Sequence, residues 1–563
     1  MRSHKILNIT SPNIDLQNTL SRELDISNIL AQLLINRGIK NPQEAEEFLN
    51  PVPDRLLDPY AFTDMQKAVG IIKGAVKNKK KVMIFGDYDV DGLTALTLLK
   101  EAFARNGVEA LHYIPHRINE GYGLNRNSVL FAKQKDISLL ITVDCGTGNS
   151  EEIKELRKHN IDVIVTDHHE PVNNEVPLSA SALINPKVKG SGYKYRDLAG
   201  VGVAYKLCQA LSGSKLLEEL DLVSLGTIAD VAPLTGENRV IVKEGLVKLT
   251  HTKRPGLKAL IETSRIKGKR ITSVSVSYIL APRINASGRV DTAETALKLL
   301  LSREDEDSMT LAKAIETLNR RRQKIEEKIM EEANDLIDRE INFKEHKIIV
   351  IAKEDWHQGV LGIVASKLAD KFYRPTIVIS KIGGICKGSG RSIKNFHLFE
   401  ALLECKDCLK TFGGHSHAAG LIITSDNIIE FRNKINCLAK EKLALEDLLP
   451  GIDIDMELSL ADLDKKVIEE FRGMEPFGTG NPEPLFYTRG LKVRGEPQVL
   501  SRDTLKFWVT DGDITLEAIG FGMGAFKGSL MNADSFDLVY TPRIDDWHGR
   551  GTVLLEGKDI FFR

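Results

Sequence analysis

Short apolar runs alternate with amphipathic stretches over residues from about 66 to 235. Runs of strand length cover residues 82–85, 139–143 and 163–165, and residues 94–103 have the apolar spacing of a helix. Alternating strand and helix patterns are typical of βαβ units, whose strands form a parallel sheet. The sequence therefore predicts a doubly wound α/β domain in this part of the chain.

The pattern changes further along the chain. Residues before Asn50 have helical apolar spacing, and residues 308–340 form a polar stretch with apolar positions at helical spacing and no proline or glycine. Strand candidates at 348–352 and 376–380 predict a second α/β unit beyond this long helix. After about residue 450, five short β-rich segments favour a small barrel with an OB-like fold.

A chain of 563 residues is long enough for roughly three or four units with cores of their own. We expect an α/β protein with five parts. Their boundaries are a helical N-terminal segment at 1–50, a catalytic α/β domain at 51–300, a long connecting helix at 301–345, a second α/β domain at 346–445 and a β-barrel at 446–563.

Composition sets limits without choosing a chemistry. With 42% hydrophobic and 28% charged residues, the chain resembles ordinary globular proteins. The formal net charge of -1 excludes a globally basic nucleic-acid binder, although 77 lysines and arginines leave room for a local basic channel. Six cysteines indicate reduced thiols; Cys405 and Cys408 have the spacing of half a zinc site, but no second pair follows. No apolar run has signal or membrane length, so we expect a cytoplasmic protein.

Acidic residues follow all three strand-like runs. Because the carboxyl ends of parallel strands meet at one edge of a sheet, these side chains should lie together. A fourth apolar stretch ends at Asp230, and convergence of four separate segments on oxygen ligands predicts a metal site. The residues after the three runs are Asp87, Asp89 and Asp91, then Asp144, then Asp167 with His168 and His169.

The first aspartates have a spacing of two residues. In an extended segment, Asp87, Asp89 and Asp91 would share one side, where their repulsion favours a bound cation. The same spacing resembles the opening of a calcium loop, but Leu98 stands where such a loop has its glutamate.

Simpler roles exist for the other residues taken singly. Asp144 and Asp167 could each be a helix N-cap, and His168 and His169 could be core or solvent histidines. Their co-occurrence favours the metal site. Aspartates with one imidazole and no thiolate suit Mn²⁺ or Mg²⁺, and two such ions are a standard device for activating water against a phosphate. Phosphoester hydrolysis is the expected chemistry.

Several motifs resemble those of a known family. Residues 86–94, 166–170, 227–234 and 413–420 look like the signatures of the DHH phosphoesterases, with Asp-His-His at 167–169. The segments 116–124, 281–289, 356–362 and 477–484 are similar to those of the single-strand-specific 5′ to 3′ exodeoxyribonucleases of that family. The resemblance covers essentially the whole chain. It implies a DHH domain, a DHHA1-type domain and a terminal OB-like barrel.

The resemblance also implies roles for individual residues. Asp144 would bridge two metal ions, His169 would face the scissile phosphate, and Asp87 would lie behind the metal ligands. The implied metal ligands are Asp89, Asp91, Asp144, His168 and Asp230, which together with His169 make up the catalytic set.

Substrate contacts follow from the same resemblance. A basic pocket one nucleotide beyond the metals would capture a 5′ phosphate and set a mononucleotide as the product, and arginine suits this task because its fork pairs with phosphate oxygens. Partners implied for the family are a single-strand-binding protein and a helicase. The implied substrate-binding residues are Arg117, Arg283, Ser389, Arg391 and His415. Stacking candidates are Tyr122, Trp356, Phe507 and Trp508, with basic and aromatic residues interleaved at 506–508 and 543–547.

Two other functions remain open. The chain could be a phosphodiesterase for short oligonucleotides or cyclic dinucleotides, or a polyphosphatase, but such proteins need neither a long connecting helix nor a terminal barrel. It could also be an inactive scaffold that binds single strands, but such a scaffold would lack metal carboxylates, and each position from Asp89 to Asp230 is filled. The sequence favours the exonuclease.

Overall fold

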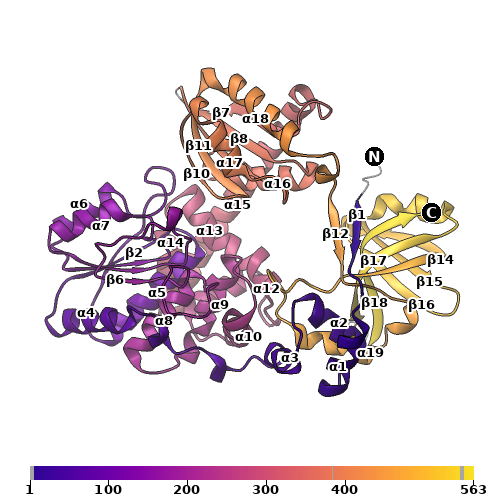
Figure 1. Ribbon diagram of the computed structural model, residues 1–563, viewed down its shortest axis with the longest axis horizontal. Coiled ribbons are helices and arrows are strands. Elements are labelled where there is room, and N and C mark those ends of the chain that lie inside the picture. The colour runs from indigo at the N-terminus through magenta and orange to yellow at the C-terminus, as the bar shows by residue number, and fades with distance from the viewer. Residues whose placement is uncertain (1–4, 383, 546–550) are drawn as a thin grey trace. The chain divides into compact units, whose positions relative to one another are not determined.

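Residues 5–382, 384–545 and 551–563 are described by a computed structural model (Figure 1). Tertiary contacts divide the chain into two compact units. The first contains Leu57–Ala232 and Gly245–Pro450. The second contains Lys5–Leu56, Pro233–Glu244 and Gly451–Arg563.

The first unit begins with the predicted doubly wound domain. Its sheet has the order β3-β2-β4-β5-β6, and all neighbouring strands are parallel. Helices α4, α5 and α8 cover one face, while α6 and α7 cover the other (Figure 1). The strands are β2 (Val82–Gly86), β3 (Leu111–Tyr113), β4 (Leu139–Val143), β5 (Asp162–Thr166) and β6 (Ala182–Ile184). The helices are α4 (Met65–Lys77), α5 (Val90–Arg105), α6 (Arg126–Gln134), α7 (Ser150–Lys158) and α8 (Gly200–Ser212).

Strand order fixes where a site can form. The connection from β2 and the connection from β4 leave toward opposite faces, so a crevice opens between the carboxyl ends of these two neighbouring strands. Both strands are buried along their whole length, which explains why their sequences are continuous apolar runs.

Helices form the remainder of this domain and connect it to the next one. The predicted long helix is α15 (Asp305–Glu340), which contacts α11 and α13 and also packs against the second sheet of this unit. The other helices of this unit are α9 (Leu220–Ala229), α11 (Pro255–Thr263), α12 (Ser273–Ser275), α13 (Ala281–Val290) and α14 (Glu294–Leu301). Helix α10 (Gly236–Thr250) begins among residues of the second unit and ends among residues of the first.

The second sheet has the order β10-β11-β9-β8-β7. Strands β7 and β8 are parallel, and the remaining pairs are antiparallel. One face packs on α15 and α16, and the other packs on α17 and α18. The strands are β7 (Ile349–Glu354), β8 (Thr376–Ile382), β9 (Ile385–Arg391), β10 (Leu409–Gly414) and β11 (Ala418–Thr424), and the helices are α16 (Leu361–Phe372), α17 (Leu398–Glu404) and α18 (Ile428–Lys442).

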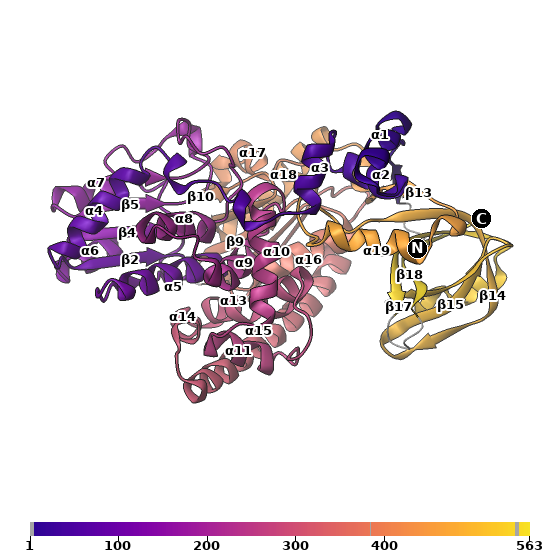
Figure 2. The same ribbon diagram turned by 90° about the horizontal axis from the view of Figure 1, so that it is seen from below.

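The second unit contains the predicted barrel. Five strands follow each other in the order β14-β15-β16-β18-β17, and pairing of β17 with β14 closes the ring (Figure 2). These strands coincide with the five β-rich segments of the sequence, so the OB-like expectation is confirmed. They are β14 (Phe486–Leu500), β15 (Thr504–Thr510), β16 (Thr515–Gly520), β17 (Phe536–Asp545) and β18 (Thr552–Phe562), with β13 (Met456–Glu457) added beside β14, and the helices α19 (Lys465–Glu470) and α20 (Lys527–Asn532) flank them.

The N-terminal helices share a core with this barrel. Leu30, Leu33 and Leu34 of α2 are buried in the same apolar cluster as barrel residues such as Phe486 and Phe507. Strand β1 (Ile6–Ile9) pairs in parallel with β12 (Gly451–Ile454). The helices are α1 (Ile14–Leu24), α2 (Asn28–Asn36) and α3 (Pro42–Leu49).

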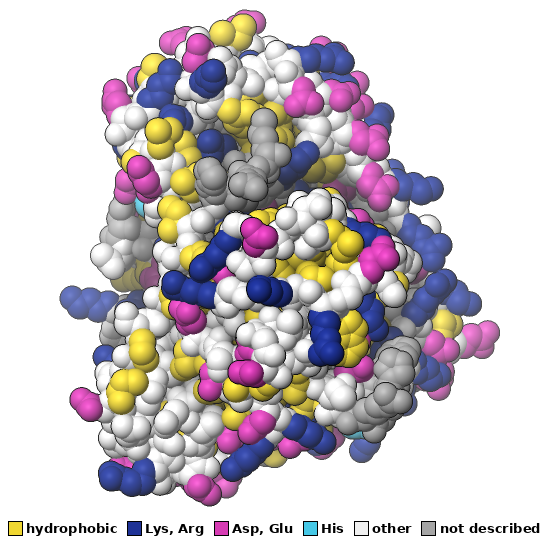
Figure 3. All heavy atoms as spheres, turned by 90° about the vertical axis from the view of Figure 1, so that its right-hand side faces the viewer, with side chains coloured by type: hydrophobic (Ala, Val, Ile, Leu, Met, Phe, Trp, Pro, Cys, Tyr) yellow, Lys and Arg dark blue, Asp and Glu magenta, His cyan; other side chains and the backbone are white. Residues whose placement is uncertain are grey.

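Two further observations bear on the class of protein. None of the described helices combines the length and the apolar character needed to cross a bilayer. On the face drawn in Figure 3, basic and acidic side chains are interspersed. That distribution agrees with a formal net charge of -1 and with a basic site that is local rather than global.

Candidate metal centre and phosphate site

The chain passes from strand β2 to helix α5 within the first aspartate motif. Asp89 is the N-cap of α5, and its Oδ1 accepts the N–H groups of Asp91 at 2.9 Å and Gly92 at 3.2 Å. A Cβ at Gly92 would lie 2.6 Å from the carbonyl oxygen of Asp87, so only glycine fits this turn. The expectation that Asp87, Asp89 and Asp91 share one side is wrong, because the chain becomes helical between Asp89 and Asp91.

Asp91 faces the start of α8 instead. Its carboxylate accepts the N–H groups of Gly200 at 2.6 Å and Val201 at 2.8 Å. A Cβ at Gly200 would lie 2.7 Å from the Cβ of Asp144, so the glycine lets α8 approach the carboxylates closely. Burial, and next the charge of Asp89, raise the pKa of Asp91 to about 7.

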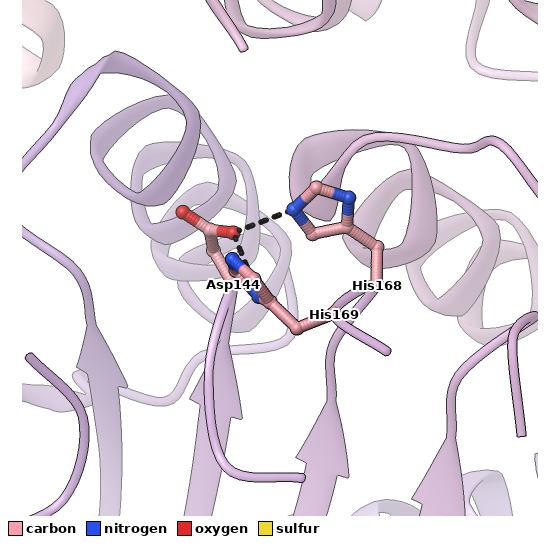
Figure 4. Close-up of side chains that lie close together, drawn as sticks. All are labelled: Asp144, His168 and His169. Atoms are coloured by element: carbon pink, nitrogen blue, oxygen red, sulfur yellow. Dashed lines mark ion pairs between the residues drawn. The ribbon is translucent and has the colours of Figure 1, made fainter. Parts of the chain in front are cut away.

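Asp144 and His168 meet at the carboxyl edge of the sheet, after β4 and β5 respectively (Figure 4). The Oδ1 atom of Asp144 lies 3.1 Å from Nε2 of His168. Both atoms are buried, and neither has a hydrogen-bond partner among the described residues. Two polar atoms that approach without bonding have the geometry of two ligands directed at a common third atom. Burial, and next the charge of Asp91, raise the pKa of Asp144.

His168 is also close to the fourth acidic motif. Its Nδ1 lies 3.7 Å from Oδ2 of Asp230, the residue that follows α9. Burial lowers the pKa of His168 to about 3, so the ring is neutral and keeps a lone pair for a metal. Burial and then the charges of Asp91 and Asp89 raise the pKa of Asp230 to about 9. Such carboxyl groups ionise readily only when a cation offsets their repulsion.

The ligand atoms fall into overlapping groups within 4.8 Å of one another. Asp144 and His168 each belong to two groups, as expected for adjacent cation sites that share ligands. Oδ1 of Asp87 is buried without a hydrogen-bond partner, so Asp87 also presents an atom to this space. Carboxylates with one buried neutral imidazole fit Mn²⁺ or Mg²⁺. The groups are Asp87 with Asp89 and Asp144, Asp91 with His168 and Asp230, and Asp144 with His168 and His169.

Asp167, which the sequence places at this sheet edge without a role of its own, positions His169. Its carboxylate accepts the N–H of Thr147 at 2.8 Å and lies 2.8 Å from Nδ1 of His169. Although burial opposes both charges, this hydrogen bond lowers the pKa of Asp167 and raises that of His169. The hydroxyl of Tyr122 donates to the carbonyl of Asp144 at 2.9 Å and lies 2.9 Å from Nδ1 of His169. Adjacency to the histidine pair in the sequence was the available signal for this role of Asp167.

The N-cap interpretations of Asp144 and Asp167 are wrong. The cap position of α7 is Asn149, five residues after Asp144. Asp167 accepts backbone N–H groups of His168 at 2.7 Å and His169 at 3.1 Å in a loop rather than at the start of a helix. Both aspartates follow strands whose next turn is irregular, so their carboxylates stay at the sheet edge.

Three arginines gather on the other side of Asp89. Arg117 lies over the ring of Tyr88 at 4.8 Å, and Arg391 Nη1 lies 3.4 Å from Oγ of Ser389. Arg289 is half-buried, and desolvation together with the charges of Arg117, Arg322 and Arg391 lowers its pKa to about 9. Within the described residues, no salt bridge joins Arg117, Arg289 or Arg391 to a carboxylate. Mutually repelling cations without a salt-bridge partner are suited to binding an anion.

Helix α16 points its first turn at the same place. A Cβ at Gly362 would lie 3.1 Å from both Arg391 Nη2 and Ser389 Oγ, so glycine lets the helix N-terminus approach them. Backbone N–H groups at the start of a helix favour an anion, and here they add to the arginines. The Gly359 carbonyl accepts from Nη1 of Arg289 at 3.3 Å, which links α13 to this segment.

Arg289 was not among the predicted binding residues, whereas Arg283 was. The guanidinium of Arg283 contacts Glu316 at 2.9 Å and the carbonyl of Ile279 at 2.7 Å. The two arginines are six positions apart along α13, which turns them to different sides of the helix. His415 is exposed in the turn between β10 and β11. Position in the 281–289 motif was the available signal for Arg289.

The stacking candidates separate into buried and exposed residues. Trp356 is 3% exposed, with Nε1 donating to Glu332 at 2.7 Å, and Phe507 is 1% exposed in the barrel core. These two predictions are wrong because apolar packing covers both rings. Trp508 is 46% exposed and Tyr122 is 49% exposed, so both rings can contact a ligand. Of the basic segment at 543–547, residues 546–547 lie outside the described part of the chain.

Comparison with known protein families agrees with this architecture. The DHH family N-terminal domain matches residues 81–227 and the DHHA1 domain matches residues 345–441, which define a DHH phosphoesterase. The RecJ OB domain matches residues 454–559. The chain belongs to the RecJ family. The resemblance seen in the sequence motifs is therefore confirmed.

Individual relatives support the assignment over most of the chain. The single-stranded-DNA-specific exonuclease RecJ of Bacillus subtilis is 37% identical over 554 residues, which cover 98% of this chain and 70% of the relative. The crystal structure of RecJ from Thermus thermophilus in complex with Mn²⁺ has a TM-score of 0.86 at 29% identity, covering all of this chain and 80% of that one. The corresponding Mg²⁺ complex has a TM-score of 0.80 at 28% identity, covering 100% and 79% of the two chains.

Proposed function

We propose that this chain is a metal-dependent exonuclease that hydrolyses single-stranded DNA from the 5′ end and releases mononucleotides. The observation that carries the proposal is a cluster of shared carboxylate and imidazole ligands at the switch point of the sheet, with an arginine site beside it. The Bacillus subtilis relative is named a single-stranded-DNA-specific exonuclease, which supports the class of activity and of substrate.

Two ions, Mn²⁺ or Mg²⁺, fit the ligand groups. Asp89, Asp91, Asp144, His168 and Asp230 would hold them, with Asp144 shared between both and Asp87 close to the first. When bound, such ions supply a nucleophilic water near neutral pH and offset charge on the phosphate. The neutral ring of His168 is ready to coordinate without first losing a proton.

His169 would act on the scissile phosphate. Its side chain is 37% exposed, and Asp167 and Tyr122 fix the ring in place. Because Asp167 raises the pKa of His169, the imidazolium form is favoured and can donate a hydrogen bond to a phosphate oxygen. Asp167 is therefore a positioning residue, held by the backbone of Thr147.

The arginine site would hold the 5′ phosphate. Arg117, Arg289, Arg391 and Ser389 supply guanidinium and hydroxyl donors, and α16 adds its N-terminal N–H groups. Arg283 and His415 remain further candidates from the sequence motifs. With the 5′ phosphate held beside the metal centre, the phosphodiester after the first nucleotide would lie at the metals, so the product would be a mononucleotide.

The setting of the reaction follows from the family and from the thiols. All six cysteines are free, which favours the reducing cytoplasm. DNA repair and recombination are the processes in which single strands with free 5′ ends arise. A single-strand-binding protein and a helicase would be the partners, since they present and generate such strands.

One assay tests the function. Single-stranded DNA labelled at either end is incubated with the protein and Mn²⁺, and products are separated by size. Immediate release of labelled mononucleotide from the 5′ label, with the 3′ label retained in shortening fragments, is the expected result. Release from the 3′ label first, or equal attack on duplex DNA, would overturn the proposal.

A further inference from the structure

A pocket of about 300 Å³ adjoins the arginine site in the first unit. Arg117 and Ser389 border it on the side of that site, and Lys387 and Thr411 line it further away. Its lining residues include two cations and no carboxylate. The pocket therefore extends the positive potential beyond the place proposed for the 5′ phosphate.

Strand β9 forms one wall of the pocket with every second side chain. Lys387, Ser389 and Arg391 are two residues apart, so their side chains stand on one face at intervals of roughly 7 Å. The Lys387 ammonium donates one hydrogen bond to the carbonyl of Ile118 at 3.0 Å. An ammonium has three N–H groups, so two remain for a ligand.

Glycines keep the floor of the pocket open. Gly420 pairs with Ser389, and Gly413 pairs with Gly420, so both glycines lie on the same face of the sheet as the Ser389 side chain. A Cβ at Gly413 would have no heavy atom within 4 Å, and one at Gly420 would meet only the carbonyl of Gly388 at 3.9 Å. Neither has a positive φ, so the local fold does not require glycine there. Glycine inside a strand often marks the approach of a ligand.

The pocket suits phosphate groups better than a base. Bases on single-strand-binding proteins stack on aromatic rings. Phe412 of the lining pairs with Leu421, which is 4% exposed, on the core side of the sheet. The groups on the open face are instead an ammonium, hydroxyls and bare backbone, which are typical ligands of phosphate oxygens.

We propose that this pocket accepts 5′ ends that carry more than one phosphate, with Lys387 binding the outer phosphates. The inference rests on the proposed function, because Ser389 and Arg391 must hold the first phosphate. Water would attack the phosphodiester between the first two nucleotides. The P–O3′ bond would break, leaving a nucleoside 5′-triphosphate with a free 3′ hydroxyl and a shortened strand with a new 5′ monophosphate. Polyphosphorylated ends are those of chains begun from a nucleoside triphosphate.

The test compares single-stranded oligonucleotides of one sequence that end in a 5′ hydroxyl, monophosphate or triphosphate. Wild-type protein with Mn²⁺ should use the triphosphate end within a few-fold of the monophosphate end and release the intact nucleoside triphosphate first. Lys387→Ala should slow the triphosphate substrate by about tenfold or more, the effect of one lost charge-assisted hydrogen bond, and the monophosphate substrate by far less. Lys387→Arg should restore it, and the exposed Lys394 supplies the control Lys394→Ala.

Lys387→Ala also removes the hydrogen bond to the carbonyl of Ile118, which could itself lower activity. A second variant therefore tests the pocket without changing Lys387. Gly420→Val fills the floor and should block triphosphate ends while monophosphate ends are still degraded. Wild-type protein that degrades monophosphate ends but rejects triphosphate ends would overturn the inference and leave the exonuclease intact. Release of a dinucleotide first would also overturn it, since the pocket would then hold a nucleotide. Failure on all three substrates would overturn the exonuclease itself.

Discussion

Oδ1 of Asp144 lies 3.1 Å from Nε2 of His168, yet no hydrogen bond joins these two buried atoms. A buried acceptor or ring nitrogen without a hydrogen bond lowers the stability of the folded protein by roughly 1–3 kcal/mol each. A cation bound by both atoms removes this cost. The order of the strands in the sheet therefore brings together the two atoms that are placed to bind a cation. One residue follows β4 and the other follows β5. Together they belong to one of the three groups of ligands, and each of them also belongs to one of the other two groups.

Loss of a ligand should abolish hydrolysis. Asp230→Asn keeps the shape of the side chain but removes a charge that offsets the bound cation, so we expect the rate with Mn²⁺ to fall by at least about 100-fold. Asp89→Ala should behave in the same way, while affinity for single strands is largely retained. Asp136→Asn, on an exposed loop residue, is the control. Near-normal turnover of Asp230→Asn would remove this carboxylate from the metal centre.

The metal-free protein should lose stability as pH rises. The folded-state pKa values of Asp91 and Asp230 are about 7 and about 9, above the value of about 4 in an unfolded chain. Between these limits the folded state binds more protons, so the free energy of unfolding decreases with increasing pH. Melting temperatures measured in chelator from pH 5 to pH 9 should fall, and Mn²⁺ should flatten the trend because it replaces the protons.

The same carboxylates give an internal control for that measurement. Asp230→Asn should raise the melting temperature of the metal-free protein at pH 8, because the folded state must keep Asp230 protonated at a pH where the unfolded chain ionises it, whereas asparagine needs no proton. Asp136→Asn should leave the melting temperature unchanged. A melting temperature that is independent of pH in chelator would contradict the inferred repulsion at the site.

Asp167→Asn should slow turnover through His169 rather than through metal binding. An amide cannot hold the imidazolium as a carboxylate does, so the pKa of His169 should fall and the rate should drop by ~10–100-fold. The pH dependence of turnover should lose activity at a lower pH than in the wild type, since deprotonation of His169 occurs earlier. Mn²⁺ affinity measured by calorimetry should change little. A large loss of Mn²⁺ affinity with an unchanged pH profile would instead make Asp167 a support of the metal ligands.

Preference for a 5′ phosphate should depend on the arginine site. Arg391→Ala and Arg289→Ala should each weaken use of phosphorylated ends by ~1.5–3 kcal/mol, and affect 5′ hydroxyl ends less. Arg283→Ala tests the sequence-based candidate, whose guanidinium contacts Glu316. Exposed Arg303→Ala is the control. Equal losses on both kinds of end would make Arg391 a general backbone contact.

Two tryptophans form a matched pair for the barrel and the core. Trp508→Ala, at an exposed ring on β15, should weaken binding of long single strands by ~1–3 kcal/mol and leave the melting temperature unchanged. Trp356→Ala, at a buried ring, should instead destabilise the protein by ~3–5 kcal/mol. If Trp508→Ala binds long strands as tightly as the wild type, the barrel does not stack bases through this ring.

Deletion of residues 450–563 is a less direct test of the barrel. The cluster around Phe486 and Phe507 also contains Leu30 and Leu33 of the N-terminal helices, so deletion would expose an apolar face elsewhere in the chain. Point variants on the outer surface avoid this loss. Salt dependence of affinity, with a shallower slope for variants that remove a phosphate contact, provides a second readout.

Sequence alone determined the strands, the fold class and the neighbourhood of the site. Parallel strands end at one edge, so the positions of Asp89, Asp144 and His168 after apolar runs were enough to predict that they converge. The resemblance of the motifs identified the family. Periodicity also located α15 and the barrel strands, because these elements repeat a local pattern over many residues.

Only the tertiary structure decided which side chains face one another. Each helical residue turns the chain by about 100°, so the single step into α5 at Val90 sends Asp91 to α8 and leaves Asp89 behind. The same rotation selects Arg289 over Arg283 for the arginine site. Burial of Trp356 and Phe507 depends on segments distant in the chain, whose packing no local pattern encodes. A ring is apolar whether neighbours cover it or not.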